Sequence, residues 1–215
     1  MAIRVLLADD HAMVRAGLRA VLSRDAAVEV VGEADSGRAV LDCLRALKPD
    51  VVVMDLSMPD LNGLDATRQV IRLLPRAKVI VLTAYTDKTM VIEALDAGAV
   101  GFVTKNSVAE ELMRAIGAVS RNQTYLCPEI AGLVVTGYRD RHARGDQGDT
   151  DVLSEREREV LQLVAEGHTT GAIAGRLHIA EKTVEAHRRN IMAKLDLHSI
   201  AELTKFAVRH GITAL

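Results

Sequence analysis

The sequence predicts an α/β domain built on a doubly wound, five-stranded parallel sheet, followed by a smaller all-α domain. Two observations carry this prediction. Up to residue 122, short apolar runs alternate five times with segments of helical periodicity, which is the pattern of βαβ units around a buried parallel sheet. Residues 151–215 contain no strand-like run, and their apolar residues have the spacing of helices.

Length and composition agree with a globular protein. The chain has 215 residues, of which 49% are hydrophobic and 26% charged, and this balance excludes a disordered or low-complexity chain. No apolar run approaches the ~18 residues of a membrane span, and the chain starts directly with a strand-like run. We therefore expect a cytoplasmic protein with no membrane partner. Two cysteines, Cys43 and Cys127, are too few for a disulfide framework.

The candidate strands are five short runs made mostly of Val, Ile and Leu, residue types that favour strands. Right-handed crossovers between parallel strands would place the intervening helices on both faces of the sheet. The runs are Ile3–Leu7, Val28–Val31, Val51–Met54, Val79–Leu82 and Gly101–Val103.

Capping residues support the helices between these strands. Ser36 and Ser107 are good N-caps, and Gly98 stands where a left-handed residue would end the fourth helix. A further short helix is expected at residues 128–137. It would precede a flexible polar linker at residues 138–150, which contains no Val, Ile, Leu, Met or Phe.

Three segments follow from this pattern. Residues 1–122 form the α/β domain, residues 123–150 contain the short helix and the linker, and residues 151–215 form the helical domain. The helices predicted in the last segment are residues 154–166, 170–177, 181–195 and 199–210.

Chemically active side chains stand at the ends of four candidate strands. Asp9 and Asp10 follow the first, Asp55 the third, Thr83 the fourth and Lys105 the fifth. The carboxyl ends of parallel strands share one edge of the sheet, so these side chains should meet. Oxygen-only ligands suit Mg²⁺, and an aspartate beside Mg²⁺ and a lysine is a phosphoryl-acceptor geometry. The alternative for any single aspartate is a structural cap of the following helix.

Four motifs in this domain resemble the receiver domain of two-component response regulators, which has a flavodoxin-like fold. They are LLADDH at residues 6–11, MDLSMPDLNG at 54–63, LTA at 82–84 and GFVTK at 101–105. The resemblance implies that Asp55 accepts a phosphoryl group from a phosphohistidine of a sensor histidine kinase.

The resemblance also implies roles for the residues around Asp55, as metal ligands, as a cationic partner and as a switch pair that reports phosphorylation. The chain departs from the family pattern at Asn106, which follows the lysine where many receivers have proline. Whether the peptide bond before residue 106 is cis is therefore an open question. The implied Mg²⁺ ligands are Asp10, Asp55 and the backbone carbonyl of Ser57, with Asp9 acting through a water; Lys105 would pair with the phosphoryl group, and Thr83 and Phe102 would form the switch pair.

Residues 170–177, a short break and residues 181–195 form a candidate helix-turn-helix. On the second helix Val184 and Ile191 would face inward, and an outward face with small alanines would allow close approach to DNA. An arginine on that face would donate two hydrogen bonds to O6 and N7 of a guanine, and flanking residues would contact phosphates. The alternative is a solvated face with ordinary i, i+4 charges. The predicted DNA contacts are Lys182, Thr183, Glu185, Ala186, Arg188, Arg189, Asn190 and Lys194.

The helical domain resembles the LuxR-type DNA-binding domain of the NarL/FixJ class of response regulators. The motifs are LSEREREVL at residues 153–161, IAGRL at 173–177 and KTVEAHRRNIMAKL at 182–195. The resemblance implies that the 181–195 helix enters the major groove of a double-stranded operator and that the last helix dimerises. Gly171 and Ala180 depart from the usual polar residue and Ser cap, each at a cost of ~1 kcal/mol in local helix stability.

The sequence therefore predicts a phosphorylation-activated transcriptional regulator, a homodimer on DNA, and not an enzyme. One rival is an aspartyl-phosphate phosphatase, which would need a second carboxylate two residues after the nucleophile, where this chain has Ser57. The other rival is a constitutive DNA binder with an inert receiver, which the intact acidic set disfavours.

Overall fold

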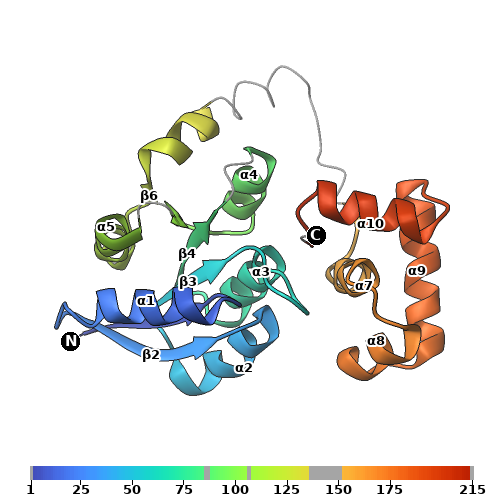
Figure 1. Ribbon diagram of the computed structural model, residues 1–215, viewed down its shortest axis with the longest axis horizontal. Helices are drawn as coiled ribbons and strands as arrows, with labels where there is room; N and C mark the ends of the chain where they lie inside the picture. Colours follow the sequence, from blue (N-terminus) through green and yellow to red (C-terminus); the bar gives the residue numbers. More distant parts are fainter. Residues whose placement is uncertain (1, 85–87, 106–107, 136–151, 214–215) are drawn as a thin grey trace. The chain divides into compact units, whose positions relative to one another are not determined.

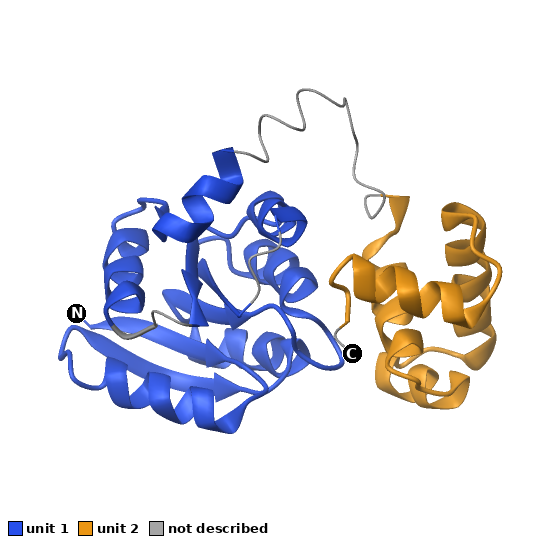
Figure 2. Ribbon diagram, turned by 45° about the horizontal axis from the view of Figure 1, so that its top comes forward, with its two compact units in different colours: residues 1–144 blue, residues 145–215 orange. Residues whose placement is uncertain are grey.

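The computed structural model describes residues 2–84, 88–105, 108–135 and 152–213. The chain forms two compact units, residues 1–144 and residues 145–215, shown in different colours in Figure 2. The first unit is α/β and the second contains only helices among its described residues. The predicted fold class is therefore confirmed.

The sheet of the first unit is parallel, and its strands lie in the order β2-β1-β3-β4-β5-β6 (Figure 1). The order reverses between β1 and β3, which is where open α/β sheets bind ligands. All five predicted strands are present, and β6 is one strand more than predicted. The bounds are β1 Ile3–Ala8, β2 Val28–Ala34, β3 Val51–Asp55, β4 Lys78–Thr83, β5 Gly101–Thr104 and β6 Tyr125–Leu126.

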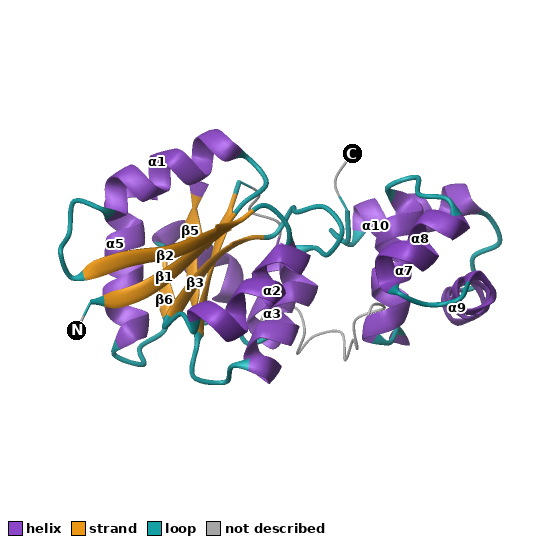
Figure 3. Ribbon diagram, turned by 90° about the horizontal axis from the view of Figure 1, so that it is seen from below, coloured by secondary structure: helices purple, strands orange, loops and turns teal. Residues whose placement is uncertain are grey.

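Helices cover both faces of this sheet, as Figure 3 shows. Successive side chains of a strand point to opposite faces, so Val5 and Leu7 of β1 join one core and Leu6 joins another. Helices α1 and α5 cover the first face, and α2, α3 and α4 cover the second. The bounds are α1 Ala12–Leu22, α2 Gly37–Leu47, α3 Gly63–Leu73, α4 Lys88–Asp96 and α5 Val108–Ser120.

The chain after α5 packs against the sheet. Strand β6 pairs with β5, so that Phe102 lies opposite Leu126, and the Cys127 N–H donates to the Phe102 carbonyl at 3.1 Å. Residues 128–135 form the expected short helix, and its fully buried Ile130 belongs to the same core cluster as Phe102. A two-residue strand is too short to show a periodic pattern. The sequence therefore predicts residues 125–126 in the segment between the two domains and not in the sheet.

Local signals for the helix ends are confirmed where the structure describes them. The Ser36 side chain accepts a hydrogen bond from the Ala39 N–H at 3.2 Å and caps α2, and Gly98 after α4 has a φ of 99°. The predicted cap at Ser107, the peptide bond at Asn106 and the linker at residues 138–150 lie outside the described residues.

The second unit contains the four predicted helices around a core of its own. Ser154 and Glu157 form a reciprocal capping box at the start of α7, whereas Ala180 provides α9 with no side-chain cap, as expected. None of the helices that the structure describes has both the length and the apolar composition that a membrane crossing needs. The bounds are α7 Glu155–Ala165, α8 Thr170–Leu177, α9 Glu181–Leu195 and α10 Ile200–Arg209.

Candidate functional site

Lys105 joins two buried carboxylates at the carboxyl edge of the sheet. Its Nζ lies 2.7 Å from Asp55 Oδ2, at the end of β3, and 2.7 Å from Asp9 Oδ2, just after β1. Asp9 and Asp55 are buried, and the side chain of Lys105 is 17% exposed. The three strand ends therefore bring together the carboxylates and the cation that the sequence predicted to meet there.

The electrostatics of this group depend on burial and on the ion pairs together. Burial raises the pKa of Asp55 above its usual value, and the charge of Asp9 raises it further, against the lowering effects of Lys105 and of the Ser57 N–H at 3.4 Å. Burial alone would lower the pKa of Lys105, but its hydrogen bonds and charge pairing with Asp55 and Asp9 outweigh burial and raise it. Lys105 therefore stays protonated, and a further cation beside Asp55 would favour its ionised, nucleophilic form.

The donor set fits a divalent cation. Ligand atoms of Asp9, Asp10, His11 and Asp55 all lie within 4.8 Å of one another. Asp9 Oδ2 is buried, and Lys105 Nζ, at 2.7 Å, is its charge partner. Carboxylate oxygens are the ligands that Mg²⁺ prefers. Asp10 is more exposed than Asp9 and Asp55, and lies at the solvent side of the group.

His11 is a neighbour of this group to which the sequence analysis gave no role. Its Nδ1 lies 2.7 Å from Asp10 Oδ1 and 3.2 Å from Asp9 Oδ1, and its backbone N–H donates to Asp9 Oδ1 at 2.8 Å. The signal in the sequence was its position directly after the two aspartates.

Thr83 and Phe102 occupy different surroundings. Thr83 is buried at the end of β4, where Asp55 of β3 is paired with the preceding Leu82. Phe102 is fully buried in β5, in the core cluster that contains Val91 of α4 and Ile130. Thr83 thus lies at the edge of the acidic group, and Phe102 lies in the core behind it.

Two glycines allow the loop after Asp55 to fold back on the sheet. A Cβ on Gly63 would lie 1.9 Å from the Asp55 carbonyl oxygen, and the Gly63 N–H donates to the Leu56 carbonyl at 2.9 Å. On the far side of the loop, a Cβ on Gly37 would lie 2.2 Å from the Leu61 carbonyl oxygen. A side chain at Gly63 would displace the backbone of Asp55 itself, and one at Gly37 would displace the backbone of Leu61 in the loop that follows, a constraint that sequence reasoning did not find.

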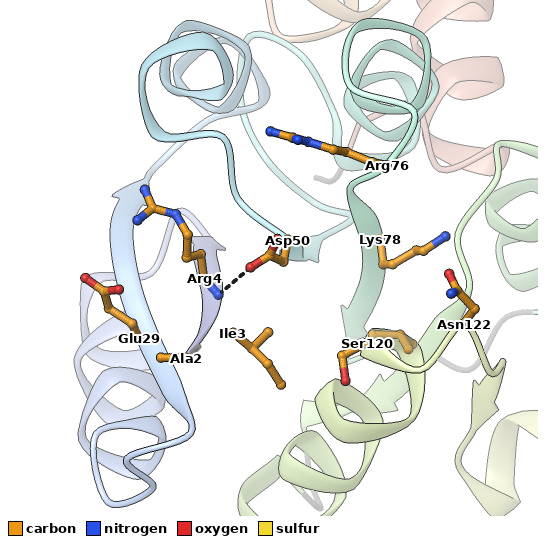
Figure 4. A pocket seen from close by; sticks show the side chains of 10 residues that line it. Ala2, Ile3, Arg4, Glu29, Asp50, Arg76, Lys78, Ser120 and Asn122 are labelled. Carbon is orange, nitrogen blue, oxygen red and sulfur yellow. Dashed lines mark hydrogen bonds between the residues drawn. The ribbon is translucent and has the colours of Figure 1, made fainter.

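A hollow of about 580 Å³ in the first unit lies at the other edge of the sheet (Figure 4). It is lined by residues at the amino ends of strands, among them Ile3, Arg4 and Lys78, and the Arg4 N–H donates to Asp50 Oδ2 at 2.9 Å. None of its lining residues belongs to the acidic group. The candidate chemistry is therefore at the open carboxyl edge and not in this cavity.

In the second unit, the predicted inward face of α9 is confirmed. Val184 and Ile191 are fully buried in the core. Of the predicted DNA contacts, Ala186 and Arg188 are half-buried and the others are solvent-exposed. The exposed predicted contacts are Lys182, Thr183, Glu185, Arg189, Asn190 and Lys194.

Lys194 has a partner inside the second unit. Its Nζ donates to Glu157 Oε2 at 2.7 Å, and Glu157 also accepts from the backbone N–H of Ser154 in the capping box of α7. Burial alone would raise the pKa of Glu157, but the hydrogen bonds from Lys194 and Ser154 outweigh it and lower that pKa. Lys194 therefore connects the C-terminal end of α9 to the start of α7.

Fold and site together define the class, a two-domain regulator of the response-regulator type. Residues 5–117 match the family model described as "Response regulator receiver domain". Residues 151–207 match "Bacterial regulatory proteins, luxR family".

Relatives of similar length agree. The chain is 39% identical to the response regulator GacA of Pseudomonas aeruginosa over 212 residues, covering 98% of this chain and 97% of GacA. It is 37% identical to the response regulator protein VraR of Staphylococcus aureus, covering 99% of both chains. Among solved structures, the complex of the two-component response regulator RcsB with DNA is similar, with a TM-score of 0.60 and 28% identity over 96% of this chain and 98% of RcsB. The chain belongs to the response regulators of the NarL/FixJ class, with a receiver domain and a LuxR-type DNA-binding domain.

Proposed function

We propose that Asp55 is the phosphoacceptor of this transcriptional regulator and that its phosphorylation, in the cytoplasm, raises the affinity of the second unit for an operator. The phosphoryl donor is a phosphohistidine of a sensor histidine kinase. The observation that carries the proposal is the position of Lys105, whose ammonium lies 2.7 Å from both Asp9 and Asp55 at the switch point of the sheet.

The chemistry is a phosphoryl transfer onto a carboxylate. An Asp55 oxygen forms a bond to phosphorus while the phosphorus–nitrogen bond to the kinase histidine breaks, and the imidazole keeps the electron pair. Lys105 moves from the Asp55 carboxylate to the incoming phosphoryl oxygens and neutralises their charge. Thr83, at the end of β4, donates its hydroxyl hydrogen to another of these oxygens.

A divalent cation completes the site. Bound Mg²⁺ supplies positive charge for the transferred group and for the crowded carboxylates. The proposed ligands are Asp10, Asp55 and the backbone carbonyl of Ser57, with Asp9 acting through a water. The support is the clustering of ligand atoms of Asp9, Asp10, His11 and Asp55 within 4.8 Å of one another, because one lysine leaves this group of three carboxylates with net negative charge.

Thr83 and Phe102 form the proposed switch pair. When Thr83 turns toward the phosphoryl group it leaves space at the end of β4, and Phe102 on the neighbouring strand repacks. Phe102 shares its core cluster with α4 and with Ile130, so its repacking alters the surface of the first unit. This promotes pairing of receivers or release of the DNA-binding unit.

Helix α9 is the proposed recognition helix in the second unit. Its exposed face carries Arg189 for base readout, with Arg188 and Asn190 at the flanks for phosphates. Two chains bind two operator half-sites, paired through α10, and linking two weak binders raises affinity without new contacts.

The test is phosphorylation of the full chain by acetyl phosphate in Mg²⁺, followed by intact-mass measurement. The wild type and the control Asp42→Asn, which changes an exposed aspartate of α2, should each gain one phosphoryl group. Asp55→Asn should gain none, because the nucleophilic oxygen is lost. Undiminished phosphorylation of Asp55→Asn would refute the assignment.

A further inference from the structure

Arg15 of α1 connects the ends of two strands behind the acidic group. Its Nη1 donates to the Asp9 carbonyl oxygen at 2.6 Å, and its Nε lies 3.4 Å from Glu33 Oε2 in β2. The side chain is only 17% exposed, although it belongs to a helix on the surface of the sheet. One planar guanidinium thus contacts the ends of both β1 and β2, an arrangement that its fork of donors allows.

Glu33 holds Arg15 in this position. It lies near the end of β2, in register with Leu7 of β1, and its other carboxylate oxygen is 2.7 Å from Nη1 of Arg19, one turn further along α1. Arg19 is 54% exposed, and its guanidinium contacts Glu33 from the solvent side. Arg15 and Arg19 therefore share one carboxylate, but only Arg15 also reaches Asp9.

The Arg15 contact completes a set of three restraints on Asp9. The Asp9 N–H donates to the Ala34 carbonyl at 3.1 Å, and Asp9 Oδ1 accepts from the His11 N–H at 2.8 Å. With its carbonyl held by Arg15, the residue is fixed on both sides of its Cα and at its side chain. Asp10 is the next residue, so the same restraints fix the peptide that it shares with Asp9 and the backbone position from which its carboxylate extends.

We propose that Arg15, oriented by Glu33, is a positioning residue for the metal: it fixes the β1 end so that the Asp9 and Asp10 carboxylates converge on one cation. This inference rests on the proposed metal site at Asp9, Asp10 and Asp55. Carboxylates brought this close repel one another, and a restraint on the backbone between β1 and α1 opposes that repulsion. Groups that orient metal ligands typically change metal affinity 10–100-fold when they are removed.

The test is a calorimetric Mg²⁺ titration of the full chain, together with the rate of phosphorylation by acetyl phosphate as a function of Mg²⁺ concentration. Arg15→Ala should raise the Kd for Mg²⁺ about tenfold. Its phosphorylation rate should return to the wild-type value at saturating Mg²⁺, because Asp55 and Lys105 are unchanged. The matched control Arg19→Ala removes an ion pair to the same Glu33 and should change the Kd less than about twofold.

Two conservative variants separate positioning from folding. Lys at position 15 has one nitrogen and cannot serve both acceptors, so Arg15→Lys should recover only part of the affinity. Glu33→Gln keeps a hydrogen-bond acceptor and the fold, and should weaken Mg²⁺ binding less than Arg15→Ala but more than Arg19→Ala. A purely structural role would instead lower the free energy of unfolding with no change in the Kd.

The outcomes also separate this inference from the proposed function. If Asp10→Ala weakens Mg²⁺ binding while Arg15→Ala and Glu33→Gln bind it with the wild-type Kd, the positioning role is wrong and the metal site stands. If Asp10→Ala also has the wild-type Kd, the metal site and the positioning role are both wrong. An equal effect of Arg15→Ala and Arg19→Ala would mean that only the net charge of α1 matters.

Discussion

At the scale of single residues, the site holds two buried carboxylates, Asp9 and Asp55, against one ammonium group, that of Lys105. Lys105 neutralises part of the charge of Asp9 and Asp55, yet the pKa of Asp55 stays above its usual value because burial outweighs the ion pair. An acid with a raised pKa makes the folded protein less stable when it is ionised. The chemistry of the site therefore has a cost in stability, and this cost depends on pH.

Replacement of Asp55 by Asn should raise the free energy of unfolding of the first unit at pH 7. The folded state holds the Asp55 proton more tightly than the unfolded state, so the stability from this group is full below the unfolded pKa of 3.8 and is lost as pH rises through the folded pKa. Urea unfolding would measure the difference. The gain in Asp55→Asn should shrink as the pH falls toward 4, and a gain that is independent of pH would contradict this account.

A second residue-scale prediction concerns the metal. Asp10→Ala removes a proposed ligand and should weaken Mg²⁺ binding and phosphorylation by acetyl phosphate together, because both depend on the same cation. Magnesium titration checks the first effect and intact-mass measurement the second. If phosphorylation falls while the Mg²⁺ affinity is unchanged, Asp10 acts in another way, as a cap or as an electrostatic partner of His11.

At the scale of elements, strand ends determine which side chains meet. Asp9, Asp55 and Lys105 could be placed at one edge from the sequence because each follows an apolar run of a parallel sheet. Arg15 could not be found in this way, since an arginine on a helix is normally a solvated charge. Gly63 ends the motif at residues 54–63, but its closeness to the Asp55 carbonyl depends on how the loop folds back.

The packing of residues 125–135 on the sheet gives a prediction about stability. Ile130 is fully buried in the cluster around Phe102, so Ile130→Ala should destabilise the first unit by about 2–4 kcal/mol. Val135, which is 54% exposed, offers the control Val135→Ala with an effect within about 0.5 kcal/mol. The chain has three tyrosines, all before residue 145, and no tryptophan, so tyrosine fluorescence during urea unfolding follows this unit alone.

If Ile130→Ala and Val135→Ala are equally stable, residues 128–135 contribute nothing to the core of the first unit. The short β6 would then be an edge pairing with no energetic role.

Helix α9 gives a prediction that separates two neighbouring arginines. Arg189 is exposed on the outward face, and Arg189→Ala should cost ~1–3 kcal/mol per half-site on a specific operator while changing the preference at one base pair. Arg188 is half-buried at the flank, and Arg188→Ala should weaken specific and non-specific DNA alike and lower the salt slope by about one unit per half-site. Binding titrations on operator and scrambled DNA at several salt concentrations measure both effects. Equal losses on both DNAs for Arg189→Ala would make Arg189 a phosphate contact.

At the scale of the whole molecule, the two units are separate in their cores and joined in function. The first unit holds the acidic group, and the second holds the helix-turn-helix. In the proposed mechanism, phosphorylation of the first unit changes the DNA affinity of the second, which is a coupling free energy between two sites. Couplings of this kind are typically about 1–3 kcal/mol, or 5–150-fold in affinity.

The central claim is tested most directly by the affinity of the full chain for DNA selected from a random pool, measured by fluorescence anisotropy with and without acetyl phosphate and Mg²⁺. Phosphorylated wild type should bind at least about fivefold more tightly than the unphosphorylated chain. Asp55→Asn should bind with one affinity under both conditions, and Asp42→Asn should behave as the wild type. Equal affinity of phosphorylated and unphosphorylated wild type, or an equal gain in Asp55→Asn, would contradict the account.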